Sequence, residues 1–392
     1  MTSDATARSA RKVASVLPAL SGAGPFADML PAAARLPPET LFHAGPPFDA
    51  HSPIPPPVLR SAAVAAVVEG WAATPEEGAA AIRAGGIALA PAQDNGLVVP
   101  LAFVAGPSTG VLRVTDAAGG GGALAAINDG PPDGALRFGA PDAGTAARLT
   151  RLNDTVAGAL DAALRDDPVP LIPIAAAALR DGDELHGQVA ASSAAILGIL
   201  GRRLAPGPAA DQVAAASQFF LNVWMAACAL MLQAGAGVAG SRLVSAAGGN
   251  GRGFGIRLAG APDRWIVRPA AVPDGPRLSP ALADVAALPA IGDSAVIDAC
   301  GFGAQAFAFA PGLRAAFGDA APAGVASAPD RLLCAVHEGF GALGVRVGLD
   351  LDRVGEAPFC ANLAMIDAAG ERGLIGRGIA VLIDGTPVAP GP

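Results

Sequence analysis

Carboxylate and imidazole side chains lie close together in one apolar part of the sequence, Gly182-Asp183-Glu184-Leu185-His186. A carboxylate beside an imidazole can carry out general acid–base catalysis. We expect Asp183 to cap the helix that follows, and Glu184 and Gln188, four positions apart, to share one face of it. The same residues also fit a capped surface helix with a solvated acidic turn, and the residues alone favour that simpler interpretation.

A glycine-rich stretch at 248–257 has the composition of an anion-binding loop, because glycine turns expose backbone N–H groups. It carries Arg252 and Arg257, whose guanidinium groups can bind phosphate or carboxylate through two hydrogen bonds. A plain hairpin turn explains the stretch equally well. Gly301-Phe302-Gly303 lacks the third glycine and the downstream acid of a dinucleotide-binding motif, so we predict no nucleotide site there.

Other polar residues in apolar surroundings are candidates for contacts with a ligand. Asp293-Ser294 could present a carboxylate and a hydroxyl or cap a helix, but Ser294 lies outside a GxSxG motif, so a hydrolase triad is unsupported. Gln218 and Asn222 are four positions apart on the most apolar segment, where buried amides need hydrogen-bond partners. The remaining candidates are His43 and Gly45 in a proline-rich loop, Asn128-Asp129-Gly130, and Arg137.

The composition argues against several classes of protein. The chain of 392 residues has a net charge of −8 and no basic cluster interleaved with aromatic residues, which argues against nucleic acid as a partner. Its four cysteines form no CxxC pair and its four histidines no HExxH motif, so we predict neither a metal site nor a cofactor. Lys12 is the only lysine, and it lies in the predicted N-terminal tail, so no catalytic lysine is expected.

Two apolar segments raise the question of a membrane. The first follows Arg8, Arg11 and Lys12, but Asp4 and Pro18 do not fit a signal peptide. The second, residues 219–240, is long enough to span a bilayer but contains polar residues and ends in glycine and alanine, so we predict a buried helix. Reduced thiols and the absence of a membrane segment predict a cytoplasmic protein.

The order of predicted elements gives an α+β fold, with two α/β parts around a central all-helical domain. Helices are expected at 58–71, at 74–86 with Thr74 as its cap, and at 329–341, and a strand near the C-terminus. The predicted parts are a flexible N-terminal tail (1–36), an α/β domain (37–145), a helical domain (146–245) and a second α/β domain (246–392).

Taken in order, these motifs are similar to those of one family. The matching segments are LFHAGPP (41–47), EGWA (69–72), the Asn128-Asp129-Gly130 and LRFGA stretch, GDELH (182–186), QFFLN (218–222), NGRGFGIR (250–257) and GDSAV (292–296). From residue 36 to residue 388 the chain resembles the bacterial oxamate/oxalurate carbamoyltransferase subunit family. The resemblance implies an activity, associated with three different subunits, that passes the carbamoyl group of oxalurate to phosphate and gives oxamate and carbamoyl phosphate.

The resemblance suggests roles for the candidate residues, because both substrate and product are anions with planar amides. Glu184, His186 and Asp293 are the expected catalytic residues for proton transfer. Anion and amide binding is expected of the other candidates, which are His43, Gly45, Asn128, Arg137, Asn222, Arg257 and Ser294.

The chain also departs from the family pattern. Gln93, Asp94 and Gly96 replace a histidine-rich segment, Gln188 replaces an arginine, and Asp298-Ala299 replaces a Glu-Thr pair. We therefore predict a divergent transferase of carbamoyl or related acyl groups that acts on a small anionic or amide substrate. A non-catalytic scaffold subunit and an amide hydrolase are the alternatives. The expected assembly is a hetero-oligomer with the family's partner subunits or a homodimer.

Overall fold

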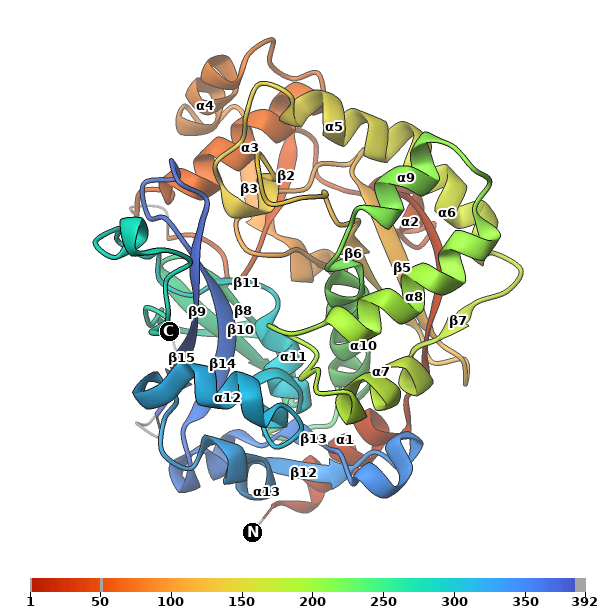
Figure 1. Ribbon diagram of the computed structural model, residues 1–392, viewed down its shortest axis with the longest axis vertical. Coiled ribbons are helices and arrows are strands. Elements are labelled where there is room, and N and C mark those ends of the chain that lie inside the picture. The colour runs from red at the N-terminus through yellow and green to blue at the C-terminus, as the bar shows by residue number, and fades with distance from the viewer. Residues whose placement is uncertain (1, 50–51, 385–392) are drawn as a thin grey trace.

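The structure is a computed structural model that describes residues 2–49 and 52–384. Figure 1 shows a mixed α+β molecule, in which the helices of residues 145–214 lie at one side and the strands of residues 244–269 and 359–383 at the other. Helix α10 (Phe219–Ala234) runs between these two groups. The predicted α+β class is confirmed. The largest hydrophobic cluster contains residues from both ends and the middle of the described chain, including Val13, Leu112, Trp224, Val244 and Phe359, and two smaller clusters lie beside it.

The first sheet has five strands in the order β4-β6-β5-β1-β7. Its pairs are antiparallel, except that β4 and β6 are parallel. The strands are β1 (Pro18–Pro25), β4 (Leu97–Val98), β5 (Gly110–Asp116), β6 (Gly122–Ala126) and β7 (Val169–Pro170). Small residues in β1 let α6 (Ala157–Leu164) pack closely on this sheet.

The prediction of a flexible tail over 1–36 is wrong for the residues that the structure describes. Helix α1 (Asp4–Ser15) begins at Ser3, whose hydroxyl accepts a hydrogen bond from the N–H of Thr6, and β1 pairs with β5 along its length. Ala10 and Val13 of α1 are buried, and the helix packs on α10 and β12 (Figure 1). Tertiary packing therefore orders a segment whose intrinsic preference for structure is weak. Helix α2 (Phe26–Met29) follows β1.

Strands β2 (Thr40–His43) and β3 (Ala88–Pro91) form a parallel pair that α3 (Pro56–Val68) and α4 (Pro75–Arg83) connect. The hydroxyl of Thr74 accepts a hydrogen bond from the N–H of Glu77 at 3.2 Å, as its position before Pro75 predicts. The helices expected at 58–71 and 74–86 are confirmed within a few residues.

The predicted helical region consists mainly of helices in the structure, joined by loops and the two-residue strand β7. Its helices are α5 (Thr145–Arg151), α6, α7 (Leu171–Arg180), α8 (Ala190–Arg203), α9 (Pro208–Ala214) and α10 (Phe219–Ala234). Nearly all of α10 is buried, which confirms the prediction of a core helix. Within the described residues, no single helix has the length and apolar composition to cross a membrane. The bent pair of α9 and α10 has this length and composition only when the two helices are taken together.

The C-terminal part contains a four-stranded sheet in the order β10-β9-β8-β11 and two hairpins. The sheet strands are β8 (Val244–Asn250), β9 (Gly253–Leu258), β10 (Ala261–Pro269) and β11 (Ile291–Gly292). The hairpins are β12 (Leu333–Val336) with β13 (Arg346–Leu349), and β14 (Phe359–Ile366) with β15 (Leu374–Ile383), and the helices are α11 (Ala295–Cys300), α12 (Pro311–Phe317) and α13 (Ala328–Leu332). The helix expected at 329–341 is wrong beyond Leu332, because the next residues pair with β13.

Candidate active site

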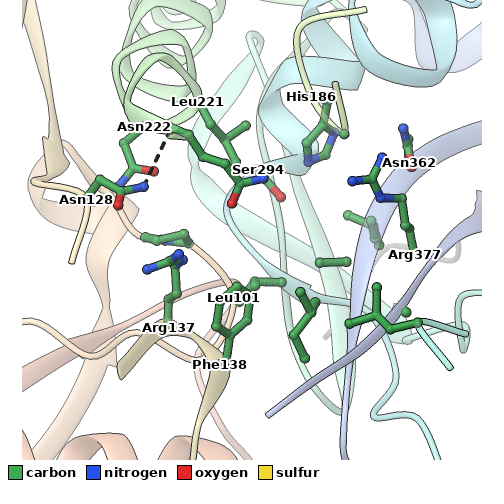
Figure 2. Close-up of a pocket in the computed structure, with 18 residues that line it drawn as sticks. Leu101, Asn128, Arg137, Phe138, His186, Leu221, Asn222, Ser294, Asn362 and Arg377 are labelled. Carbon is green, nitrogen blue, oxygen red and sulfur yellow. Dashed lines mark hydrogen bonds between the residues drawn. The ribbon is translucent and has the colours of Figure 1, made fainter. Parts of the chain in front are cut away.

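A cavity of about 90 Å³ lies where the first turn of α10, the start of α11 and the β14–β15 hairpin meet several loops (Figure 2). A cavity of about 150 Å³ holds a molecule as large as benzene, so this one suits small ligands. Apolar side chains, including Leu101 and Phe138, form part of the wall. Its polar lining comes from Asn128, Arg137, His186, Gln218, Asn222, Ser294, Asn362 and Arg377.

The segment that holds His186 is a buried loop, which corrects the expected helix. Helix α8 begins only at Ala190, because Gly182 and Leu185 have positive φ values of 94° and 70°. Asp183 still caps α8 from a distance, since its Oδ2 accepts a hydrogen bond from the N–H of Ser192 at 2.9 Å. The alternative of a solvated acidic turn is wrong as well, because Asp183, Glu184 and His186 are all buried.

Glu184 fixes the shape of this loop from inside. Its carboxylate accepts hydrogen bonds from the N–H groups of His186 at 3.1 Å and Gln188 at 2.6 Å. Nδ2 of Asn362 donates a third at 3.2 Å. Glu184 does not line the cavity, so the structure places it behind His186.

His186 reaches the cavity as part of a His–Asp pair. Its Nδ1 lies 2.7 Å from Oδ2 of Asp298, which leaves Nε2 as the nitrogen available to a ligand. The other oxygen of Asp298 accepts hydrogen bonds from the N–H groups of Ala304 at 2.8 Å and Asn362 at 3.2 Å. Asp298 thus orients the imidazole ring and is itself held in place.

Burial and charge act in opposite directions on this group of residues. Burial lowers the pKa of His186, but the charge and hydrogen bond of Asp298 and the charge of Glu184 outweigh it, so the pKa is raised above its usual value. Burial raises the pKa of Glu184 to about 7, although the charge of His186 and the hydrogen bonds from the loop oppose the rise. Glu184 therefore keeps its proton to a higher pH than an ordinary carboxyl group.

This raised pKa predicts a pH-dependent stability that Glu184→Gln removes. Between the ordinary carboxyl pKa and about 7, the unfolded chain loses the proton of Glu184 while the folded chain keeps it, so stability falls as pH rises. Across that window we expect the wild-type chain to lose about 3 kcal/mol of unfolding free energy relative to the variant. Urea unfolding of both proteins at a series of pH values measures this difference, and parallel profiles would contradict it.

Asp293, the third predicted catalytic residue, lies outside the cavity wall. Its carboxylate accepts hydrogen bonds from the N–H of Gly45 at 2.9 Å, Nε2 of Gln93 at 2.6 Å and the N–H of Val99 at 2.9 Å. Burial raises the pKa of Asp293 to about 7 despite these three donors. Asp293 therefore joins three loops, and the side chain next to it, Ser294, faces the cavity (Figure 2).

His43 and Gly45 also lie away from the cavity. His43 is buried with its ring against that of Phe48 at 4.3 Å, and burial lowers the pKa of His43 to about 4 despite a hydrogen bond to the carbonyl of Ala44. Gly45 has a φ of 75° and packs on the backbone of β8, where a Cβ would lie 2.4 Å from the carbonyl carbon of Gly249. Both residues shape the loop beside Asp293.

Gly45→Ala is expected to lower the unfolding free energy much more than Gly85→Ala. Gly85 has nearly the same φ, 77°, but a Cβ there meets nothing within 4 Å, so its replacement costs only about 1 kcal/mol of backbone strain. Gly45→Ala adds a clash with backbone atoms that cannot rotate away. Denaturant titrations of the two variants measure the difference, and equal losses would show that the close contact with β8 is unimportant.

Arg257, a predicted anion-binding residue, lies outside the cavity and interacts with other residues of the protein. It forms an ion pair with Asp94 and lies 4.4 Å above the ring of Trp265, whose Nε1 also donates to Asp94. Asp94 is one of the departures from the family pattern, and Gln93 beside it holds Asp293. The two departures thus have structural partners outside the cavity.

The remaining predicted binding residues do line the cavity. Arg137 is paired with Asp129 and donates to the carbonyl of Gly130 at 2.8 Å, so the protein already balances its charge. Asn128 accepts a hydrogen bond from the N–H of Gly130 at 3.0 Å. Nδ2 of Asn222 donates to the carbonyl of Ala126 at 2.8 Å, while its Oδ1 has no donor within the described residues.

The sequence did not lead us to expect Asp298, Asn362 and Arg377 at the site. A signal existed for Asp298, because an aspartate inside the apolar run of α11 must find a polar partner. Asn362 and Arg377 come from facing strands of the last hairpin, and nothing in their spacing links them to His186. The described residues contain no group of three or more His, Cys, Asp or Glu that could hold a metal ion.

Together, the fold and the cavity define a mixed α+β protein with a small cavity lined by amide, guanidinium and imidazole side chains. The sequence pattern of the family described as oxamate carbamoyltransferase subunit AllG matches residues 87–294. The chain is 30% identical to the oxamate carbamoyltransferase subunit AllG of Escherichia coli K12 over 286 residues, which is 70% of this chain and 67% of that protein. The chain belongs to this family as a divergent member, which confirms the resemblance seen in its motifs.

Two further proteins are similar over most of their length. The uncharacterized protein YahG of Escherichia coli K12 is 27% identical over 364 residues, which covers 87% of this chain and 75% of YahG. A crystal structure of a conserved protein of unknown function from Enterococcus faecalis V583 superposes with a TM-score of 0.86 at 24% identity. The superposition covers 96% of this chain and 93% of that one, so the two proteins share the fold.

Proposed function

We propose that this chain provides the reaction site of a carbamoyl-transferring enzyme whose substrates are small amide anions of the oxamate type. The family relationship supports a transferase-related role. The observation that carries the proposal is the His186–Asp298 pair at the wall of an enclosed cavity lined with amide and guanidinium groups. Such a cavity matches a planar ligand that needs both donors and acceptors.

The proposed reaction requires two proton movements that one histidine can supply. In the direction that forms carbamoyl phosphate, an oxygen of phosphate attacks the ureido carbon of oxalurate, and the bond from that carbon to the oxamate nitrogen breaks. Nε2 of His186 accepts the proton of the attacking phosphate and returns it to the departing nitrogen, which is a poor leaving group without it. The negative charge of Asp298 stabilises the imidazolium that exists between these steps.

The same cavity supports the orientation of the carbamoyl group. Amide side chains of Asn128 and Asn222 lie together on one side of it (Figure 2), and Gln218 also lines the cavity. An amide group matches the N–H and C=O edge of a carbamoyl group, because each offers one donor and one acceptor in a plane. Positioning of this kind contributes directly to the rate of a two-substrate reaction.

Phosphate release tests the proposal. The purified chain, alone and together with the subunits encoded beside it, is incubated with carbamoyl phosphate and oxamate, and both phosphate and oxalurate are measured. We expect oxalurate to form in step with phosphate. Phosphate release without oxalurate would identify a hydrolase. A complex that turns over equally well with His186→Gln in this chain would instead identify a scaffold subunit, the role that the word subunit in the relative's name also allows.

A further inference from the structure

Two arginines line the cavity from different sides (Figure 2), and they differ in what holds them. Arg137 is bound by Asp129 and by the carbonyl of Gly130. The guanidinium group of Arg377 on β15 makes no hydrogen bond or ion pair with residues 2–49 or 52–384, the part that the structure describes. Arg377 therefore supplies the unbalanced positive charge of the cavity.

We propose that Arg377 binds the anionic end of the substrate, and that the cavity selects small anions that also carry an amide or ureido group. This inference rests on the proposed function and names the residue that recognises the charge of the substrate at the same site. A guanidinium group binds a carboxylate or phosphate through two parallel hydrogen bonds. Arg377 is thus the anion-binding residue, in place of Arg137 and Arg257, whose charges the protein itself neutralises.

The hairpin that carries Arg377 also connects it to the His–Asp pair. Ala364 of β14 pairs with Arg377, and Asn362 lies two residues before Ala364 on the same strand. Its backbone N–H donates to Asp298 and its Nδ2 to Glu184. Figure 2 shows Arg377, Asn362 and His186 gathered at one end of the cavity. An anion held by Arg377 is therefore placed beside His186.

Two acceptor atoms at the cavity lack a donor. Oδ1 of Asn222 and Oδ1 of Asn362 are buried and have no hydrogen-bond partner within the described residues, although both side chains line the cavity. A buried acceptor without a donor costs about 1–3 kcal/mol. Because the terminal torsion of asparagine is soft, each oxygen can turn toward an N–H group that enters the cavity. The ligand therefore needs N–H donors as well as negative charge.

Isothermal titration with two nearly isosteric probes tests this inference without any turnover. Oxamate carries one carboxylate and one amide, whereas oxamide carries two amides and no charge. We expect the wild-type chain to bind oxamate at least 10-fold more tightly than oxamide. Arg377→Gln should weaken oxamate binding by about 10- to 100-fold and abolish this preference, while Arg377→Lys keeps part of it.

The matched control is Arg314→Gln, which removes an exposed arginine of α12 outside the cavity and should leave both affinities unchanged. Thermal melting of each variant checks that the fold is intact. Oxamate binding that survives Arg377→Gln, or a wild-type chain that does not prefer oxamate, would overturn the inference. If binding depends on Arg377 but no carbamoyl transfer occurs in any assembly, the proposed function fails and the anion site stands.

Discussion

His186→Gln is expected to lower the rate of carbamoyl transfer by about 10²- to 10⁴-fold, the usual contribution of a general acid–base residue. Glutamine can still donate a hydrogen bond to Asp298, so the loop should keep its shape while the transferable proton is lost. The affinity for oxamate should change little. The rate of oxalurate formation in the reconstituted enzyme measures this effect.

Asp298→Asn should have a different signature, because Asp298 acts through the imidazole. Without its negative charge, burial dominates, and the pKa of His186 falls. The pH dependence of the rate should then shift to lower pH, together with a large loss at the optimum. The control is His337→Gln, since His337 is also buried but lies outside the cavity, with its Nε2 on the carbonyl of Val16. Normal turnover of His186→Gln would exclude His186 from the chemistry of carbamoyl transfer.

Asp293→Asn is expected to cause the largest loss of stability of any single substitution considered for this site. Three N–H donors converge on the carboxylate of Asp293, and an asparagine would turn an NH₂ group toward at least one of them. Each hydrogen bond to a charged group contributes about 1.5–3 kcal/mol, so we expect a loss of about 3 kcal/mol or more. Urea denaturation measures it.

The control for this substitution is Asp94→Asn, because Asp94 is partly exposed and its pair with Arg257 should contribute only about 1 kcal/mol. Activity per folded molecule separates the two roles considered for Asp293. If Asp293→Asn folds with nearly normal stability but abolishes turnover, Asp293 is catalytic, as its sequence context first suggested. If stability falls and the folded fraction stays active, it is a structural link between loops.

Local sequence signals predicted the elements well where one segment decides the outcome. The Thr74 cap and the buried character of α10 are examples, and both depend on residues within a few positions of each other. The prediction for the N-terminal segment was wrong, because α1 is ordered by packing on α10 and β12, which are distant in the sequence. The prediction of a helix after Leu332 was wrong for the same reason, since pairing with β13 decides the conformation of these residues.

The residues of the site also differ in how far they could be predicted from nearby sequence. His186, Asn128, Arg137, Asn222 and Ser294 were found as polar residues in apolar surroundings, and the structure brings them to one cavity. Their partners could not be found in this way. Asp298 is 112 positions from His186, and Asn362 is 178 positions from Glu184.

Contacts within the protein explain why three binding candidates, His43, Gly45 and Arg257, lie away from the cavity. His43 and Gly45 share their loop with proline residues that suggested a ligand contact, but they pack against Phe48 and the backbone of β8. Arg257 looked free in the sequence, and its partner Asp94 is 163 positions away. Isolated polar residues in a sequence therefore indicate that a partner exists, and only the fold shows whether that partner is a ligand or the protein.

A crystal structure of the protein with oxamate tests the central claim most directly. The account predicts one oxamate molecule in the cavity, with its carboxylate on Arg377 and an atom within hydrogen-bond distance of Nε2 of His186. Oxamate bound elsewhere, for example in the open groove beside Met29, Arg113 and Gly122, with only water in the cavity, would contradict it.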